Sequence, residues 1–260
     1  MIKSGILLLS FIFTTARHLS AGSIATPRLD GLTEHQNTED NILLDKVLEQ
    51  LKCSKSEIRE ELYTEKIWPY DPSLTIMVIP KIAQQELDAY GNGSYVMDSY
   101  VLLVDHKTAT IKNLFYEAEA WNSDAMVLSE IVIDTAPYQL NNDTRGFGIR
   151  INYTGSSRPN PYNQTLFTLF IPEGDRLRPL LKDYEIDRFT GEWDTNCAGA
   201  FDDRASVIMI DKAQTNHFNN IILKQTLRHT LNYKVGEDCE EKVSTKKKTV
   251  LLKFDKKSYR

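Results

Sequence analysis

The chain has 260 residues, of which 41% are hydrophobic and 26% are charged, and its formal net charge is −5 at pH 7. This length and composition suit one domain of ordinary size, or two small ones, that needs neither a metal nor a dense disulfide framework to fold. The modest acidity argues against a nucleic acid as the partner, because phosphate binding requires a basic face.

The chain begins with the parts of a cleavable secretory signal. Lys3 supplies positive charge, residues 5–14 form a short uncharged apolar run, and small residues follow. The run is shorter than the roughly 20 apolar residues that cross a bilayer, so the alternative is a buried N-terminal strand or helix. Small-residue cut sites follow Ala16 and Gly22, and we favour the later one. We therefore predict a signal peptide over residues 1–22 and a soluble mature protein without a membrane span, either periplasmic or secreted.

Residues 23–64 are predicted to be a leader with amphipathic helices. The first part of this segment is polar and mixed, which is typical of disorder. Apolar residues then recur at helical spacing, which predicts a helix over residues 39–52. Ser54 and Glu57 have the spacing of a capping box, which predicts a second short helix over residues 55–63.

Residues 65–260 are predicted to form one β-rich domain. Apolar and polar residues alternate over residues 146–153 with the period of two that is typical of a half-buried strand. Short strands at hairpin spacing, with helices only at the front, indicate an antiparallel sheet or sandwich. Residues 175–182 are expected to be a helical turn or the entry to a strand. The predicted strands are 74–79, 95–104, 110–119, 127–134, 146–153, 164–171, 184–193, 207–211, 221–233 and 249–254.

Three cysteines lie beyond the predicted signal peptide, and two of them should pair in an oxidising compartment. Cys197 and Cys239 lie in polar, turn-like surroundings, whereas Cys53 ends a predicted helix. We therefore predict a disulfide between Cys197 and Cys239, which leaves Cys53 free or paired between chains. The rival interpretation is a metal site, but no CxxC or HxxxH spacing supports one, so no metal is expected.

The most enzyme-like residues are the carboxylates Glu192, Asp194, Asp202 and Asp203. Two carboxyl groups about 5–10 Å apart can act as acid and base in glycoside hydrolysis, and carboxylates can also hold calcium. The competing interpretation, which we favour, is a polar loop with solvated acids.

The histidines of the β-rich domain are weaker candidates for catalysis than these carboxylates. His106 and His217 fall at predicted hairpin turns, and His229 falls within a predicted strand. A Ser–His–Asp triad is recognised by its geometry rather than by its sequence positions, and the chain lacks a G-x-S-x-G elbow. We assign no catalytic role to these histidines, and we expect no cofactor.

Residues 155–163 (GSSRPNPYN) are the best candidate for a binding loop. Two prolines stiffen this long polar segment, which presents Arg158 and Tyr162. Loops held by a β scaffold often carry recognition residues, and Arg and Tyr are frequent interface anchors. The alternative is a connector whose prolines shield an edge of the sheet.

The C-terminal stretch 242–260 holds eight Lys and Arg residues against the single acid Asp255. Such a stretch could touch anionic lipid or an acidic partner. We favour solvated lysines that protect a terminal edge strand, because charged side chains discourage pairing with a second sheet.

Several unusual strings occur between residues 133 and 203, namely IDTAPY, RGFGIR, GSSRPNP, GEWD and CAGAFDD, and DCEE follows at 238–241. Together they resemble a family of uncharacterised exported bacterial proteins, over roughly the C-terminal half of the chain. The resemblance implies a bacterial source and supports the Cys197–Cys239 pairing, but it carries no function.

We expect a non-enzymatic binding or inhibitor-like protein of the bacterial envelope, such as an immunity protein against a toxin, with another envelope protein as its partner. Export, a small β scaffold and a stiff polar loop favour this reading. One alternative is a hydrolase that acts on glycan or cell wall through the loop carboxylates. The other alternative is a structural envelope protein.

Overall fold

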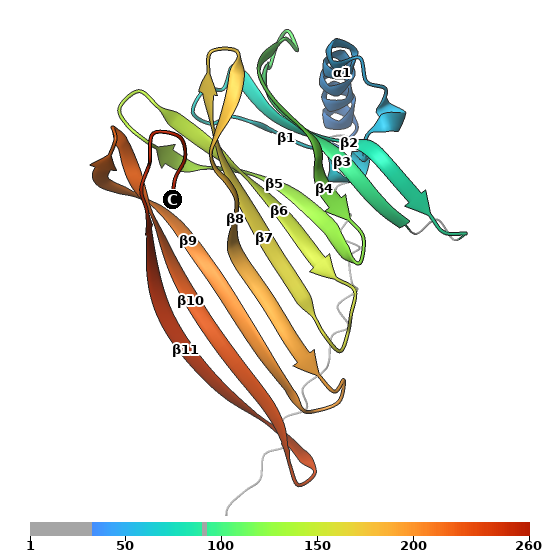
Figure 1. Cartoon of the computed structure of the whole chain (residues 1–260). Helices are drawn as coiled ribbons and strands as arrows, with labels where there is room; N and C mark the ends of the chain where they lie inside the picture. The colour runs from blue at the N-terminus through green and yellow to red at the C-terminus, as the bar shows by residue number, and fades with distance from the viewer. Residues whose placement is uncertain (1–32, 90–92) are drawn as a thin grey trace, which may run out of the picture. The chain divides into compact units, whose positions relative to one another are not determined.

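The computed structural model describes residues 33–89 and 93–260, with side chains from residue 42 onward. The predicted signal peptide, residues 1–22, and its cut sites lie outside this part of the chain. The described residues form one α-helix, two 3-10 helices and an 11-stranded sheet, so the predicted mainly β fold is confirmed (Figure 1). The elements are α1 (Thr33–Leu51), η1 (Lys55–Glu57), η2 (Glu60–Leu62), β1 (Thr64–Ile67), β2 (Leu74–Leu87), β3 (Gly93–Asp105), β4 (Ile111–Ser123), β5 (Met126–Gln139), β6 (Arg145–Gly155), β7 (Tyr162–Glu173), β8 (Arg176–Trp193), β9 (Gly199–Thr215), β10 (Phe218–Val235) and β11 (Asp238–Leu252).

The strands of the compact unit Asp40–Arg260 form two antiparallel meanders, β1–β4 and β5–β11, in which each strand pairs with the next. A parallel pair between Leu114 and Arg176 joins β4 to β8. The predicted hairpins β3–β4 and β9–β10 are both present. Residues 175–182, where a helical turn was the alternative, lead into β8 and extend it to 18 residues.

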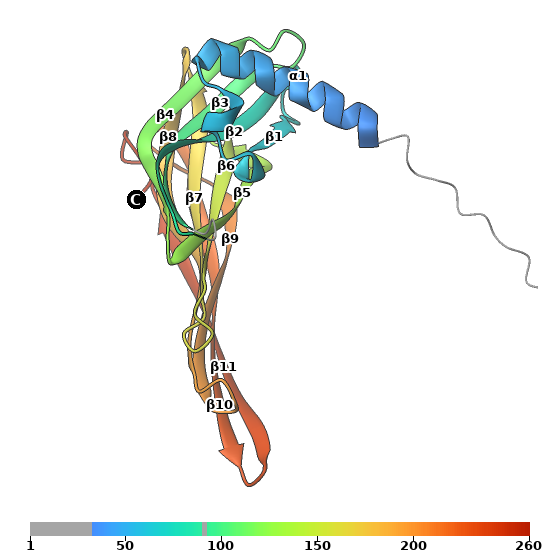
Figure 2. The same ribbon diagram turned by 90° about the vertical axis from the view of Figure 1, so that its right-hand side faces the viewer.

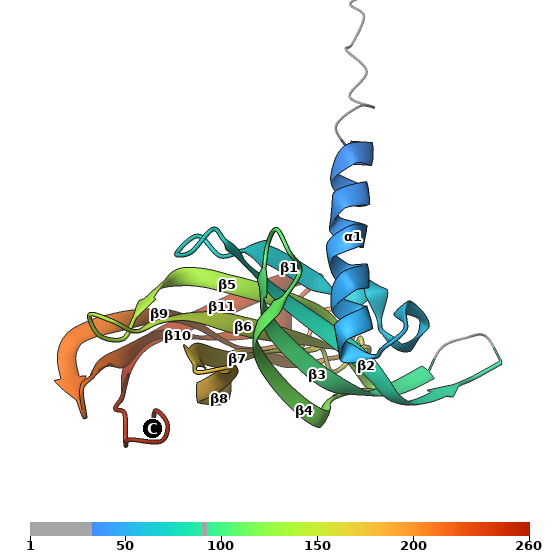
Figure 3. The same ribbon diagram turned by 90° about the horizontal axis from the view of Figure 1, so that it is seen from above.

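The apolar run of β2 is divided between two cores because successive side chains of a strand point to opposite faces. Ile76 and Val78 face the core that β2 and β3 share with β5 and β6. Met77 and Ile79 face the other way, toward Val47 and its neighbours on α1, which lies beside β2 and β3 (Figure 3). Burial on both faces explains why this strand is continuously apolar instead of alternating.

The N-terminal helical segment differs from its prediction in length and type. Helix α1 begins at Thr33, earlier than the predicted residue 39, and ends at Leu51. Residues 55–63 form two 3-10 helices instead of one α-helix, although the Ser54–Glu57 capping box is present, with the Ser54 amide donating to Glu57 Oε2 at 2.7 Å. A stretch this short is a poor α-helix nucleus. No helix in the described part of the chain is long and apolar enough to span a membrane.

The strands β8–β11 continue beyond the packed core as a ribbon (Figures 1 and 2). Along one face of β10, Ile221 and Leu223 are fully buried, whereas the His229 side chain is 49% exposed. Strand pairing nevertheless persists to Val235 and Asp238 at the far turn. We call residues 155–163, 188–206 and 226–247 the extension, and the remainder of Asp40–Arg260 the body.

Strand β11 begins at Asp238, well before the predicted start at residue 249. Residues 238–248 carry three acids and four lysines and lack the apolar alternation that marks a strand in sequence. Backbone pairing with β10 holds it in place. Within the described residues β11 pairs only with β10, which agrees with the prediction of a lysine-protected edge strand.

Candidate functional site

Four of the unusual strings meet on one face of the extension, where GSSRPNP and DCEE join GEWD and CAGAFDD, which flank the turn between β8 and β9. They border an open, mainly apolar cavity of about 500 Å³. GSSRPNP, GEWD, CAGAFDD and DCEE each contribute to its wall. We call this region the aromatic surface, formed by Arg158, Pro161, Phe189, Trp193 and Phe201 beside Cys197 and Cys239.

The predicted binding loop is fixed to strand β8 by backbone hydrogen bonds. The Trp193 amide donates to the Pro159 carbonyl at 2.7 Å, and the Gly191 amide donates to the Pro161 carbonyl at 3.0 Å. These bonds place the Arg158 guanidinium 5.3 Å from the centroid of the Trp193 ring, a cation–π distance. The loop therefore presents Arg158 on a rigid aromatic support instead of as a free side chain.

Close packing at Gly191 holds the loop against the sheet. A Cβ atom at this position would lie 2.4 Å from Cδ1 of Phe201 and 3.0 Å from Cγ of Pro161. The Phe201 ring is stacked with that of Phe189, with centroids 6.0 Å apart and planes 7° apart. A side chain at Gly191 would push these rings out of place, so glycine is needed here for the approach of the loop.

A disulfide connects the two turns at the end of the extension. Cys197, between β8 and β9, and Cys239, at the start of β11, are joined with their Cα atoms 5.7 Å apart, as the sequence predicts. In the turn before Cys197, Asp194 Oδ1 accepts the amides of Asn196 and Cys197, both at 2.9 Å. The hydrogen bond from the Asn196 amide is the largest of the effects that hold the pKa of Asp194 below its usual range. Asp194 therefore shapes the turn that carries the disulfide.

Cys53, the third cysteine, lies outside the extension. Its side chain is 8% exposed within the core between α1 and the sheet, and it is unpaired within the chain. Burial raises the pKa of its thiol.

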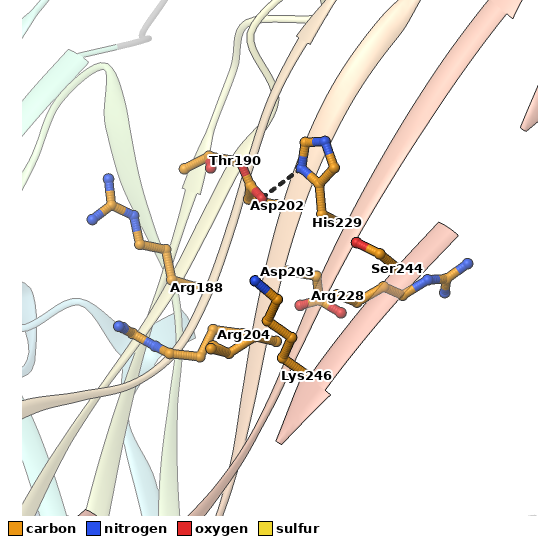
Figure 4. A pocket seen from close by; sticks show the side chains of 10 residues that line it. Arg188, Thr190, Asp202, Asp203, Arg204, Arg228, His229, Ser244 and Lys246 are labelled. Carbon is orange, nitrogen blue, oxygen red and sulfur yellow. Dashed lines mark hydrogen bonds and ion pairs between the residues drawn. The ribbon is translucent and has the colours of Figure 1, made fainter. Parts of the chain in front are cut away.

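The opposite face of the extension holds a second cavity, of about 560 Å³ (Figure 4). Four polar residues lie in one cross-strand row, each opposite the next: Thr190, Asp202, His229 and Ser244. His229 Nδ1 lies 2.8 Å from Asp202 Oδ1. In the neighbouring row on this face lie Arg188, Arg204, Leu227 and Lys246. We call these two rows the basic pocket.

The four candidate carboxylates do not form one cluster. Glu192 and Asp202 occupy adjacent rows of the same face and line a cavity of about 470 Å³ together with Tyr162. Asp203 follows Asp202 in strand β9 and therefore points to the other face.

Tyr162, the second predicted binding residue, does not join Arg158 on the aromatic surface. Its ring instead lies 5.6 Å from the Arg188 guanidinium.

The sequence analysis did not predict that His229 lies in one cross-strand row with Asp202, Thr190 and Ser244. The turn pairs Thr215 with Phe218, and this register, continued along the hairpin, would place His229 opposite Arg204. A bulge between Asn219 and Ile221 shifts the register by two residues and brings His229 opposite Asp202.

The strings IDTAPY and RGFGIR form a half-buried polar network in the body and take no part in either surface. Asp134 Oδ2 accepts from Arg150 Nη2 at 2.7 Å, from Arg150 Nε at 2.9 Å and from the Tyr138 hydroxyl at 2.7 Å. Burial alone would raise the pKa of Asp134, but the amide of Ala136, Tyr138 and Arg150 outweigh it and lower that pKa. Every oxygen of this carboxylate is thus satisfied within the fold, which is a structural role.

The described residues contain no group of three or more His, Cys, Asp or Glu side chains arranged to hold a metal ion. No protein-family model, no curated protein and no solved structure matches this chain.

Proposed function

We propose that this protein is exported to the bacterial envelope and there binds another protein through the aromatic surface, as an inhibitor or immunity protein would. The observation that carries the proposal is the convergence of three separate segments, the 155–163 loop, the β8–β9 turn and the β10–β11 turn, on one open apolar cavity next to Arg158 and Trp193. Trp and Arg are the residues that most often dominate binding energy at protein interfaces.

The rigidity of this surface favours binding further. The loop is hydrogen-bonded to β8 at Gly191 and Trp193, and the disulfide ties the adjacent turns together. A surface that is already ordered loses little conformational entropy when a partner docks. The signal-like N-terminus and the disulfide both fit an oxidising compartment, which supports the exported location.

The test is the capture of a partner from envelope extract by natively exported, tagged protein, followed by mass spectrometry. Trp193→Ala and Arg158→Ala should each weaken capture of the identified partner at least tenfold, because hot-spot truncations cost about 2 kcal/mol or more. Arg176→Ala is the matched control, since Arg176 is an exposed arginine on the body. Equal capture by wild type and Trp193→Ala would refute binding through the aromatic surface.

A second candidate is hydrolysis of a glycan, because Glu192 and Asp202 share one cavity with Tyr162. Two carboxylates on one cavity wall are the minimum that acid–base hydrolysis of a glycosidic bond requires. In this case Glu192→Gln should abolish release of sugar from purified cell-wall glycan. Asp203→Asn should leave it unchanged, since Asp203 faces away from that cavity. If neither wild type nor variants release sugar, the hydrolase candidate fails.

A further inference from the structure

The basic pocket has a surplus of positive charge that the protein itself does not neutralise. Asp202 accepts a contact from His229 Nδ1, and Glu185 pairs with Arg204 and lies 3.9 Å from Arg188 Nη1. With His229 neutral, the three cations Arg188, Arg204 and Lys246 face the two carboxylates of Glu185 and Asp202, which leaves one positive charge unmatched. Lys246 makes no ion pair with any described residue, and its amine points into the cavity (Figure 4).

One donor in this pocket is already removed from water without a partner. The Nε atom of Arg204 is buried and makes no hydrogen bond within the described part of the chain. Leaving a buried donor of a charged group unpaired costs about 1–3 kcal/mol, so a change of the Arg204 rotamer that turns this atom toward an acceptor in the cavity would be favourable. An anionic oxygen is the acceptor that suits a guanidinium best.

The remaining groups of the pocket suit a polyol. The hydroxyls of Thr190 and Ser244 flank the Asp202–His229 pair, and Glu192 lies one row further along the same face. Hydroxyls and carboxylates of this kind exchange hydrogen bonds with sugar hydroxyls. The cavity of about 560 Å³ falls within the range of small-ligand sites.

We propose that the basic pocket binds a phosphorylated sugar. Arg188, Arg204 and Lys246 would hold the phosphate, and Thr190, Ser244 and Asp202 would bind the hydroxyls of the ring. Guanidinium groups match phosphate oxygens in geometry as well as in charge. The ligand is either a free sugar phosphate or the phosphorylated sugar headgroup of a lipid. The site lies on the opposite face from the aromatic surface and does not depend on partner binding there.

Isothermal titration calorimetry of the disulfide-bonded protein with glucosamine 6-phosphate tests this directly. We expect binding that is stronger than that of either inorganic phosphate or glucosamine alone, and that weakens as salt is added. Lys246→Gln should reduce the affinity about tenfold, as expected for the loss of one charge-assisted hydrogen bond. Lys247→Gln is the matched control, because the neighbouring lysine carries the same charge on the other face of β11.

Binding to phosphatidylcholine vesicles that carry a phosphorylated glucosamine glycolipid is then measured for the same proteins. This measurement separates a lipid headgroup from a free sugar phosphate as the ligand. Binding to the vesicles but not to glucosamine 6-phosphate would assign the site to a lipid headgroup, and the reverse would assign it to a free sugar phosphate. Binding to neither probe would overturn the proposal. An equal loss in Lys246→Gln and Lys247→Gln would overturn it as well, because attraction would then follow net charge and not this pocket. Both variants are exposed substitutions, and an unchanged melting temperature confirms that they fold.

Discussion

Strands β2 and β11 have similar lengths, 14 and 15 residues, but they are stabilised in different ways. Residues 75–80 of β2 are buried and contribute to cores on both faces of the strand, whereas β11 is exposed from Asp238 to Thr249. The body is held together by burial of apolar surface, and the extension is held by backbone pairing, cross-strand contacts and a disulfide. The three cavities that we assign to a partner or a ligand all lie in the extension, where the choice of side chains is not dictated by the core.

The largest expected effect comes from an aromatic residue of the body. Phe147 is fully buried in the core, so Phe147→Ala should lower the free energy of unfolding by about 3–5 kcal/mol. Phe201→Ala in the extension should cost about 1 kcal/mol, because the ring is only partly buried and has one stacking partner. Urea denaturation of both variants measures the contrast. Similar losses in the two variants would mean that the extension is as tightly packed as the body.

Removal of the disulfide should act on the extension and spare the body. The bond spans 42 residues of sequence, and its loss in the double variant Cys197→Ser and Cys239→Ser should cost about 3 kcal/mol. Hydrogen exchange should show lost protection in residues 226–235, with β2 and β3 unchanged. Reduced wild type should behave in the same way. Loss of protection throughout the sheet would contradict a separation between the two regions.

The half-buried ion pair of the body gives a smaller effect that depends on pH. Asp134→Asn leaves Arg150 without its counter-ion and should cost about 2 kcal/mol at pH 7. Because the folded protein lowers the pKa of Asp134, the wild type keeps this contribution above the unfolded pKa of about 4 and loses it as the pH falls through the folded value. Denaturation at neutral pH and in acid should therefore show a difference between wild type and variant that shrinks in acid. A constant difference would exclude the carboxylate charge as its source.

The polar strings show how alike structural and ligand-facing motifs are in sequence. IDTAPY and GEWD each combine an acid with an aromatic residue, yet Asp134 is saturated by Arg150 and Tyr138 in the body. Asp194 instead organises a turn, and the adjacent Trp193 opens onto a cavity. Burial separates the two cases, and burial depends on strands that are distant along the chain.

The amino-acid sequence by itself determined the mainly β class, most strand positions, the capping box at Ser54 and the pairing of Cys197 with Cys239. These features follow from local alternation, turn residues and the surroundings of each cysteine, which are properties of short segments. Only the tertiary structure decided that Glu192 and Asp202 share a face, that Asp203 does not, and that His229 meets Asp202. The bulge at residues 219–221 sets that register, and its position depends on how β10 packs against the core and β9. The tertiary structure likewise placed Arg158 against Trp193. These two residues are 35 positions apart in sequence, and only the pairing of β7 with β8 brings their side chains together.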